Sequence, residues 1–162
     1  MRAIALFLAL VLALSAAHKV QSPDRLATAT GRLAGVTGPL ATVLMVLAGG
    51  IEAVAALCLV LPGATSAGGV IAAGLWAAYG FALWRRRGET LDCGCDLVAR
   101  PHPVGLPQVL RPLVLAGLAL VMGALPASDS LPIDVLAAFG ALALYLAALE
   151  ILAIPHPRWR TS

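Results

Sequence analysis

Long apolar runs, separated by short polar or Pro- and Gly-containing connections, dominate the chain. They cover residues 3–17, 40–61, 68–84, 109–125 and 133–154. Because the hydrocarbon core of a bilayer is about 30 Å thick, a spanning helix needs about 17 to 25 apolar residues. The last four runs reach this length, and the first falls slightly short of it. The pattern predicts an all-α, polytopic transmembrane bundle of four to five helices.

The run at residues 3–17 is open to two interpretations. Arg2 precedes it and the small residues Ser15 to Ala17 end it, as in a secretory signal peptide that is removed. His18 and Lys19 follow, however, and such side chains can reach the membrane interface from the end of a retained helix. We prefer the retained helix.

The composition is that of a membrane protein. The 162 residues are 60% hydrophobic and 12% charged, with a mean hydropathy of +0.94, whereas soluble domains carry about 25% charged residues. We expect residues 1–162 to form one multi-pass domain of the cell membrane, in contact with the lipid bilayer, with a longer connection at residues 85–108. The sequence has no basic domain or aromatic platform, so we predict no nucleic-acid binding. It has no quinone or haem motif, so we predict no cofactor.

The basic residues are distributed unevenly between the connections. Nine of the eleven lie after the first, third and fifth runs: Lys19, Arg25, Arg32, Arg85, Arg86, Arg87, Arg100, Arg158 and Arg160. Positive residues accumulate in cytoplasmic connections. With five spans, the distribution predicts an outside N-terminus, a cytoplasmic C-terminus and a cytoplasmic connection at residues 85–108.

Two thiols stand one glycine apart in that connection. Residues 91–96 read Leu-Asp-Cys-Gly-Cys-Asp, which places Cys93 and Cys95 on either side of Gly94. Glycine accepts backbone angles that a Cβ forbids, so the chain can bend there and bring the sulfurs together. A second sulfur two residues away also favours the resolution of a mixed disulfide. The pattern predicts a redox pair with thiol-disulfide exchange activity.

Two other interpretations of these cysteines stay open. The pair can be an inert staple of the connection, because Cys-x-Cys is less specific than Cys-x-x-Cys. Cys93, Cys95 and His102 would also suit copper(I) or zinc, but a structural zinc site needs a fourth ligand that this connection does not supply. We therefore predict no metal site. Cys58 lies inside an apolar run, where a free cysteine packs as a small hydrophobe.

One acidic residue, Glu52, falls near the middle of the run at residues 40–61. A charge at this depth costs about 2.5 kcal/mol or more, so Glu52 should face a partner. Arg111 or the pair His18 and Lys19 can supply it. The carboxyl group is then either a proton or ligand site between helices, or part of a structural ion pair or hydrogen bond. Arg111 is also placed to hold the thiol connection by hydrogen bonds.

At these positions the sequence resembles the methylamine-utilisation MauE family, which belongs with the DoxX-like membrane proteins. The resemblance covers about residues 5–125. It includes Ser15 to Lys19, Glu52, the run from Arg86 to Cys95, and Arg111. The family typically has Phe-Gly after the second cysteine and Asn after the arginine, where this chain has Asp96-Leu97 and Pro112.

The resemblance implies a membrane protein needed for making methylamine dehydrogenase, through disulfide formation, transport or maturation of its small subunit alongside a thioredoxin-like partner. We therefore expect an integral membrane thiol-redox protein whose Cys93 and Cys95 exchange with a thioredoxin-fold protein and serve an exported cysteine-rich client. Glu52 and Arg111 are second-rank binding candidates. The alternative is a non-enzymatic scaffold or small-molecule carrier that uses Glu52.

The predicted topology and this role conflict. A maturation factor for exported proteins should face outward, whereas the charge distribution places Cys93 and Cys95 in the cytoplasm. The conflict disappears if the pair accepts electrons inside and passes them across the membrane.

Overall fold

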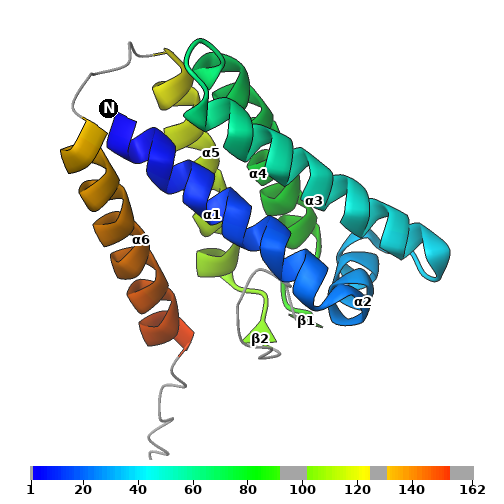
Figure 1. Ribbon diagram of the computed structural model, residues 1–162. Coiled ribbons are helices and arrows are strands. Elements are labelled where there is room, and N and C mark those ends of the chain that lie inside the picture. The colour runs from blue at the N-terminus through cyan, green and yellow to red at the C-terminus, as the bar shows by residue number, and fades with distance from the viewer. Residues whose placement is uncertain (1, 92–101, 125–130, 154–162) are drawn as a thin grey trace, which may run out of the picture.

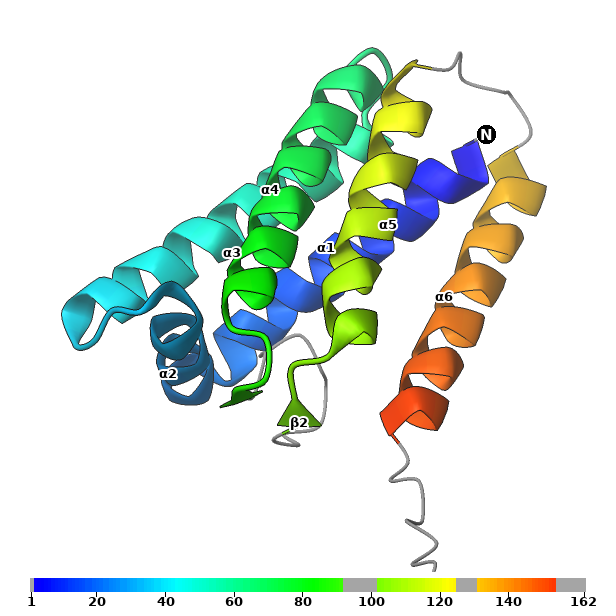
Figure 2. The same cartoon turned by 180° about the vertical axis from the view of Figure 1, so that it is seen from behind.

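The computed structural model describes residues 2–91, 102–124 and 131–153, and within them the chain is helical (Figures 1 and 2). The predicted redox pair, Cys93 and Cys95, lies outside the described residues. The helices are α1 (Arg2–Gln21), α2 (Pro23–Ala34), α3 (Pro39–Val60), α4 (Thr65–Arg85), α5 (Leu106–Ala124) and α6 (Leu131–Ala153). Two very short strands, β1 (Thr90–Leu91) and β2 (His102–Pro103), pair between α4 and α5. The expected all-α architecture is confirmed.

Five of these helices, α1, α3, α4, α5 and α6, are long and apolar enough to cross a membrane. Each coincides with one predicted run to within a few residues. The main difference is α1, which continues to Gln21 because His18 and Lys19 form its last turn. The protein is a multi-pass integral membrane protein, as expected.

The short helix α2 was not among the predicted elements. Pro23 opens it, and Gly35 ends it with the left-handed φ of 76° that favours glycine. Leu26 and Ala29 are buried, whereas Asp24 and Arg32 are exposed. This amphipathic helix lies at the end of the bundle where α1 ends and α3 begins (Figures 1 and 2). At 12 residues it is too short to span a membrane.

Small residues let the spanning helices approach closely. A Cβ added to Gly68 of α4 would lie 2.7 Å from the backbone nitrogen of Leu59 in α3. One added to the next residue, Gly69, would lie 2.7 Å from the backbone oxygen of Ala119 in α5. Close approach of this kind is how helices associate in lipid, where the hydrophobic effect between them is weak. The two glycines therefore fix α4 between α3 and α5.

The remaining helices pack around α1. It contacts α3 along one side and α6 along the other, and Figures 1 and 2 show α6 at the edge of the bundle. The main core combines buried residues of α1, α3, α4, α5 and α6, among them Leu8, Leu12, Ala55, Trp76, Leu115 and Leu142. Because α1 is part of this core, the packing of the core holds the polar last turn of α1 against α3.

Candidate functional site

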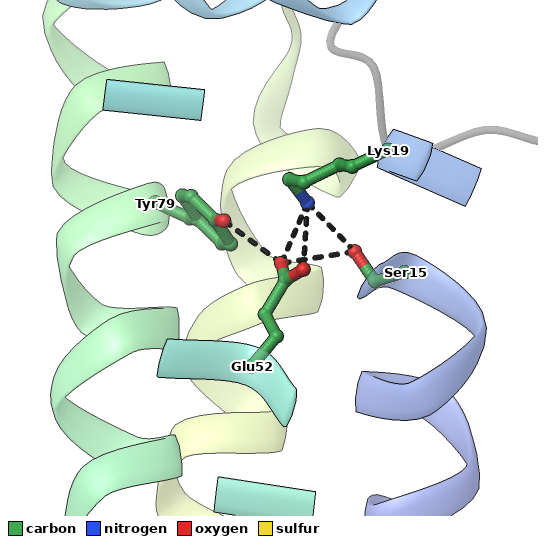
Figure 3. Close-up of polar contacts among 4 residues, drawn as sticks. All are labelled: Ser15, Lys19, Glu52 and Tyr79. Atoms are coloured by element: carbon green, nitrogen blue, oxygen red, sulfur yellow. Dashed lines mark hydrogen bonds and ion pairs between the residues drawn. The ribbon is translucent and has the colours of Figure 1, made fainter. Parts of the chain in front are cut away.

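Glu52 lies in a closed polar cluster between α1, α3 and α4 (Figure 3). Its side chain is 1% exposed, and it forms an ion pair with Lys19, whose side chain is 12% exposed. The ammonium nitrogen lies 2.7 and 2.8 Å from the two carboxylate oxygens. Of the two cation sources suggested by the sequence, the partner is therefore the end of α1 and not Arg111.

Two hydroxyl groups complete the cluster. Ser15 of α1 and Tyr79 of α4 each donate a hydrogen bond to Oε1 of Glu52, at 2.9 and 2.8 Å. Lys19 also donates to the Ser15 hydroxyl at 3.0 Å. An ammonium group has three donors, and the two carboxylate oxygens and this hydroxyl use all three. The cluster thus neutralises Glu52 and ties three helices together.

The backbone of α3 makes room for the lysine. A Cβ added to Gly49 would lie 3.3 Å from Cδ of Lys19, so the lysine stem lies close to α3 one turn before Glu52. The ammonium group also lies 5.8 Å from the centre of the Tyr79 ring, within the range of a cation–π contact. The arrangement is that of a buried ion pair whose donors and acceptors are used, which favours the second of the two interpretations of Glu52. The role of Glu52 stays a prediction.

Arg111 lies in a separate cluster between α5 and α6. Its Nε donates a hydrogen bond of 2.6 Å to the hydroxyl of Tyr145, and its guanidinium carbon lies 5.1 Å from the centre of that ring. The edge-on contact of Tyr145 with Phe7, at a centroid distance of 5.7 Å, connects this pair to α1. Among its described contacts, Arg111 therefore joins α5 to α6. Hydrogen bonds from it to the thiol connection remain a prediction.

Pro112, one of the departures from the family pattern, is buried in α5. A Cβ added to Gly80 of α4 would lie 2.8 Å from Leu113 and 3.6 Å from Pro112. The proline therefore faces α4 where the two helices meet, and it leaves the adjacent Arg111 directed to Tyr145.

The base of the thiol connection lies within the described residues, whereas the cysteines lie outside them. Leu91 pairs with His102 in the β1–β2 ladder. Next to the ladder, Gly88 donates to the carbonyl of Val104 at 3.0 Å, and Val104 donates to that of Glu89 at 2.9 Å. These bonds bring the two ends of the connection together at one end of the bundle (Figure 1).

A small hydrophobic cluster supports this base. It buries Leu83 of α4 and Val109 of α5 with Val104, which lies between β2 and α5. Leu33 of α2 packs against them. The missed helix α2 is thus part of the support of the thiol connection.

The structure therefore places the sequence-predicted residues in different locations. Glu52 and Arg111 belong to two clusters, and the side chains of Cys93, Cys95 and His102 are outside the described part of the chain. Sequence reasoning missed Tyr79 and Tyr145. A signal was available, because these are the only two tyrosines in the sequence, and each contacts one of the two candidate charges.

Comparison with known proteins connects these features to a family. The family model described as methylamine utilisation protein MauE matches residues 1–125. The chain is also 35% identical over 127 residues to the methylamine utilization protein MauE of Methylophilus methylotrophus, which covers 75% of this chain and 66% of that relative. No solved structure matches the chain significantly. The family match includes all members of the Glu52 cluster, both cysteines and Arg111, and stops before α6, so the chain belongs to the methylamine utilisation protein MauE family.

Proposed function

We propose that the protein acts in methylamine utilisation as a membrane-embedded thiol-disulfide exchange protein. The process is taken from the name of the relative in Methylophilus methylotrophus. The chemistry is taken from Cys93 and Cys95, the only vicinal thiols in the sequence. Its role is to exchange disulfides with a thioredoxin-fold partner during the maturation of an exported cysteine-rich client.

The observation that supports this proposal most directly is the anchored base of the thiol connection. The β1–β2 ladder and the bonds of Val104 fix both ends of the segment that carries the cysteines. The base lies beyond the end of α4, where Arg85, Arg86 and Arg87 mark the membrane surface. An exchange pair needs such a position, since a soluble partner must reach the sulfur atoms.

The exchange is balanced without a further reactant. A thiolate of the pair attacks a disulfide of the partner and forms a mixed disulfide, and the second thiolate then displaces the partner. Two thiols become one disulfide in this protein, and the two electrons and two protons pass to the sulfur atoms of the partner. The same steps in reverse oxidise a dithiol client.

The Glu52 cluster supports a structural role over the carrier alternative. A carrier that binds cargo through Glu52 needs a carboxylate with free acceptor positions or a removable partner. Here Oε1 already accepts three hydrogen bonds, and every donor of Lys19 is used. Cargo would have to displace a buried ion pair, which is costly.

The test compares cysteine variants in a Cys58→Ser background. Each single variant, Cys93→Ser and Cys95→Ser, is expected to abolish client oxidation, and the variant that retains the attacking thiol should accumulate a mixed disulfide visible on non-reducing gels. The double variant should accumulate to the same level in the membrane and form no such adduct. Growth on methylamine and intact client disulfides in both single variants, with loss of function in Glu52→Gln, would establish the carrier instead.

The side of the membrane is tested by labelling intact cells with a membrane-impermeant maleimide, again without Cys58. The charge distribution predicts labelling of Cys93 and Cys95 only after lysis. That result would mean electron uptake from a cytoplasmic thioredoxin-fold protein, the reverse of the client oxidation tested above, or no oxidative role for the pair. Labelling of intact cells after external reduction would place a disulfide outside, in position to oxidise exported clients directly.

A further inference from the structure

A cleft of about 850 Å³ opens between α2, the turn that follows it, the start of α3 and the residues just after α4. This volume is within the range of about 300 to 1,000 Å³ typical of small-molecule sites. Four charged side chains line the cleft, Asp24, Arg32, Arg86 and Glu89, together with three threonines. It is distinct from the Glu52 cluster and from the Arg111 cluster.

The cleft lies at one end of the spanning helices α3 and α4, where the membrane surface is expected. Thr42, which lines it, is in the first turn of the spanning helix α3, and Arg86 directly follows the spanning helix α4. Further along α3, an apolar stripe lies on the same side of the helix as Thr42: Val46, Leu57 and Val60 are exposed at helical spacing. A ligand that occupies both features has a polar head and an apolar chain.

The two arginines are available to an anionic group. Within the described part of the chain, the guanidinium group of Arg32 has no ion pair or hydrogen bond. Arg86 forms a 3.3 Å ion pair with Glu89, but both side chains remain substantially exposed, at 32% and 49%. Exposed pairs of this kind are weak. Guanidinium groups are well suited to bind phosphate oxygens.

The turn after α2 positions one of these arginines. Gly35 has a φ of 76°, and a Cβ there would lie 2.7 Å from Nη2 of Arg86. The absence of a side chain at Gly35 thus lets the guanidinium group lie against the backbone at the cleft.

We propose that the cleft binds the headgroup of a zwitterionic phospholipid with a primary amine, that is, phosphatidylethanolamine. The lipid phosphate contacts Arg32 and Arg86, the ammonium group donates to Asp24 and Glu89, and an acyl chain follows the apolar stripe of α3. The charge of the lining selects this class, because two cations and two anions match a zwitterion. A purely anionic headgroup would leave both carboxylates without a cation.

The test measures lipid binding to the detergent-purified full chain by native mass spectrometry, with phosphatidylethanolamine, phosphatidylglycerol and phosphatidylcholine. Phosphatidylethanolamine should bind most tightly, since the quaternary amine of phosphatidylcholine has no N–H donor. Loss of one charge-assisted contact in Arg32→Gln should weaken binding roughly tenfold. The matched control is Arg87→Gln, at the same end of the bundle but outside the lining, and it should bind as the parent does.

A second variant tests the amine. Asp24→Asn, at an exposed position, should reduce the preference for phosphatidylethanolamine over phosphatidylcholine and leave phosphate-dependent binding in place. Equal weakening by Arg32→Gln and Arg87→Gln, or tighter binding of phosphatidylglycerol, would overturn the proposal in favour of general attraction to anionic lipid. Displacement of bound lipid by inorganic phosphate at equal concentration would overturn it in favour of a free-anion site.

Discussion

The protein accommodates its two candidate charges within the membrane helices in different ways. Glu52 is almost fully buried and is neutralised by an ion pair, with two hydroxyls completing its hydrogen bonds. Arg111 is half-buried near the start of α5, and its described contact is the neutral hydroxyl and ring of Tyr145. The first cluster joins α1, α3 and α4, whereas the second joins α5 to α6.

The difference follows from how deep each charge lies in its helix and from how far each side chain can extend. A carboxylate in the middle of a helix has a short side chain and cannot reach water, so it needs a counter-charge beside it. A guanidinium group near a helix end has a long apolar stem that can extend to the interface, so it depends less on a counter-charge buried beside it. We therefore expect a large loss of stability when the contact between Glu52 and Lys19 is removed, and a moderate loss when the contact between Arg111 and Tyr145 is removed.

The largest effect should come from Lys19→Met. The change leaves the Glu52 carboxylate buried without a cation, and breaking a buried ion pair in this way typically costs about 3 to 5 kcal/mol. The free energy of unfolding, measured by steric trapping in bicelles, should fall by this amount. The double variant Lys19→Met, Glu52→Gln removes both charges and should recover much of the stability. A double variant no more stable than Lys19→Met alone would show that the charge of Glu52 is not the cause.

The second prediction concerns Arg111→Gln. Loss of its hydrogen bond and ring contact with Tyr145 should cost about 1 to 3 kcal/mol, because contacts of charged groups contribute in this range. The same variant tests whether Arg111 holds the thiol connection. The rate of maleimide labelling of Cys93 and Cys95 should rise if it does, and an unchanged rate would rule out this role of Arg111.

Much of the fold could be predicted from the sequence because lipid imposes a length on each apolar run. The run predicted at residues 40–61 is α3, Pro39–Val60, and the others agree similarly well. Helix α2 was missed because its 12 residues contain few apolar positions and carry no requirement to span. Its end signals, Pro23 and Gly35, were present but are also common in simple connections.

The site was less predictable because pairing depends on how helices are arranged. The depth of Glu52 required a partner, and the sequence offered both Arg111 and the end of α1. Only the packing of α1 against α3 selects Lys19. Tyr79 and Tyr145 are separated from their partners by 27 and 34 residues, so no local pattern could identify them.

The smallest expected losses of stability come from removing the hydroxyl group of each tyrosine, and the two variants can be compared directly. Tyr79→Phe removes one of three hydrogen bonds to Oε1 of Glu52 and leaves Lys19 in place. Tyr145→Phe removes the hydroxyl to which Nε of Arg111 donates. Each change should cost about 1 kcal/mol or less, with the larger loss at Tyr145, because Glu52 keeps its ion pair with Lys19 and its bond from Ser15, whereas Arg111 loses the hydroxyl described as its acceptor. Thermal unfolding of both variants in one detergent measures the order. A larger loss for Tyr79→Phe would mean that the ion pair needs its hydroxyls to remain buried, and the cluster would then act as one cooperative network.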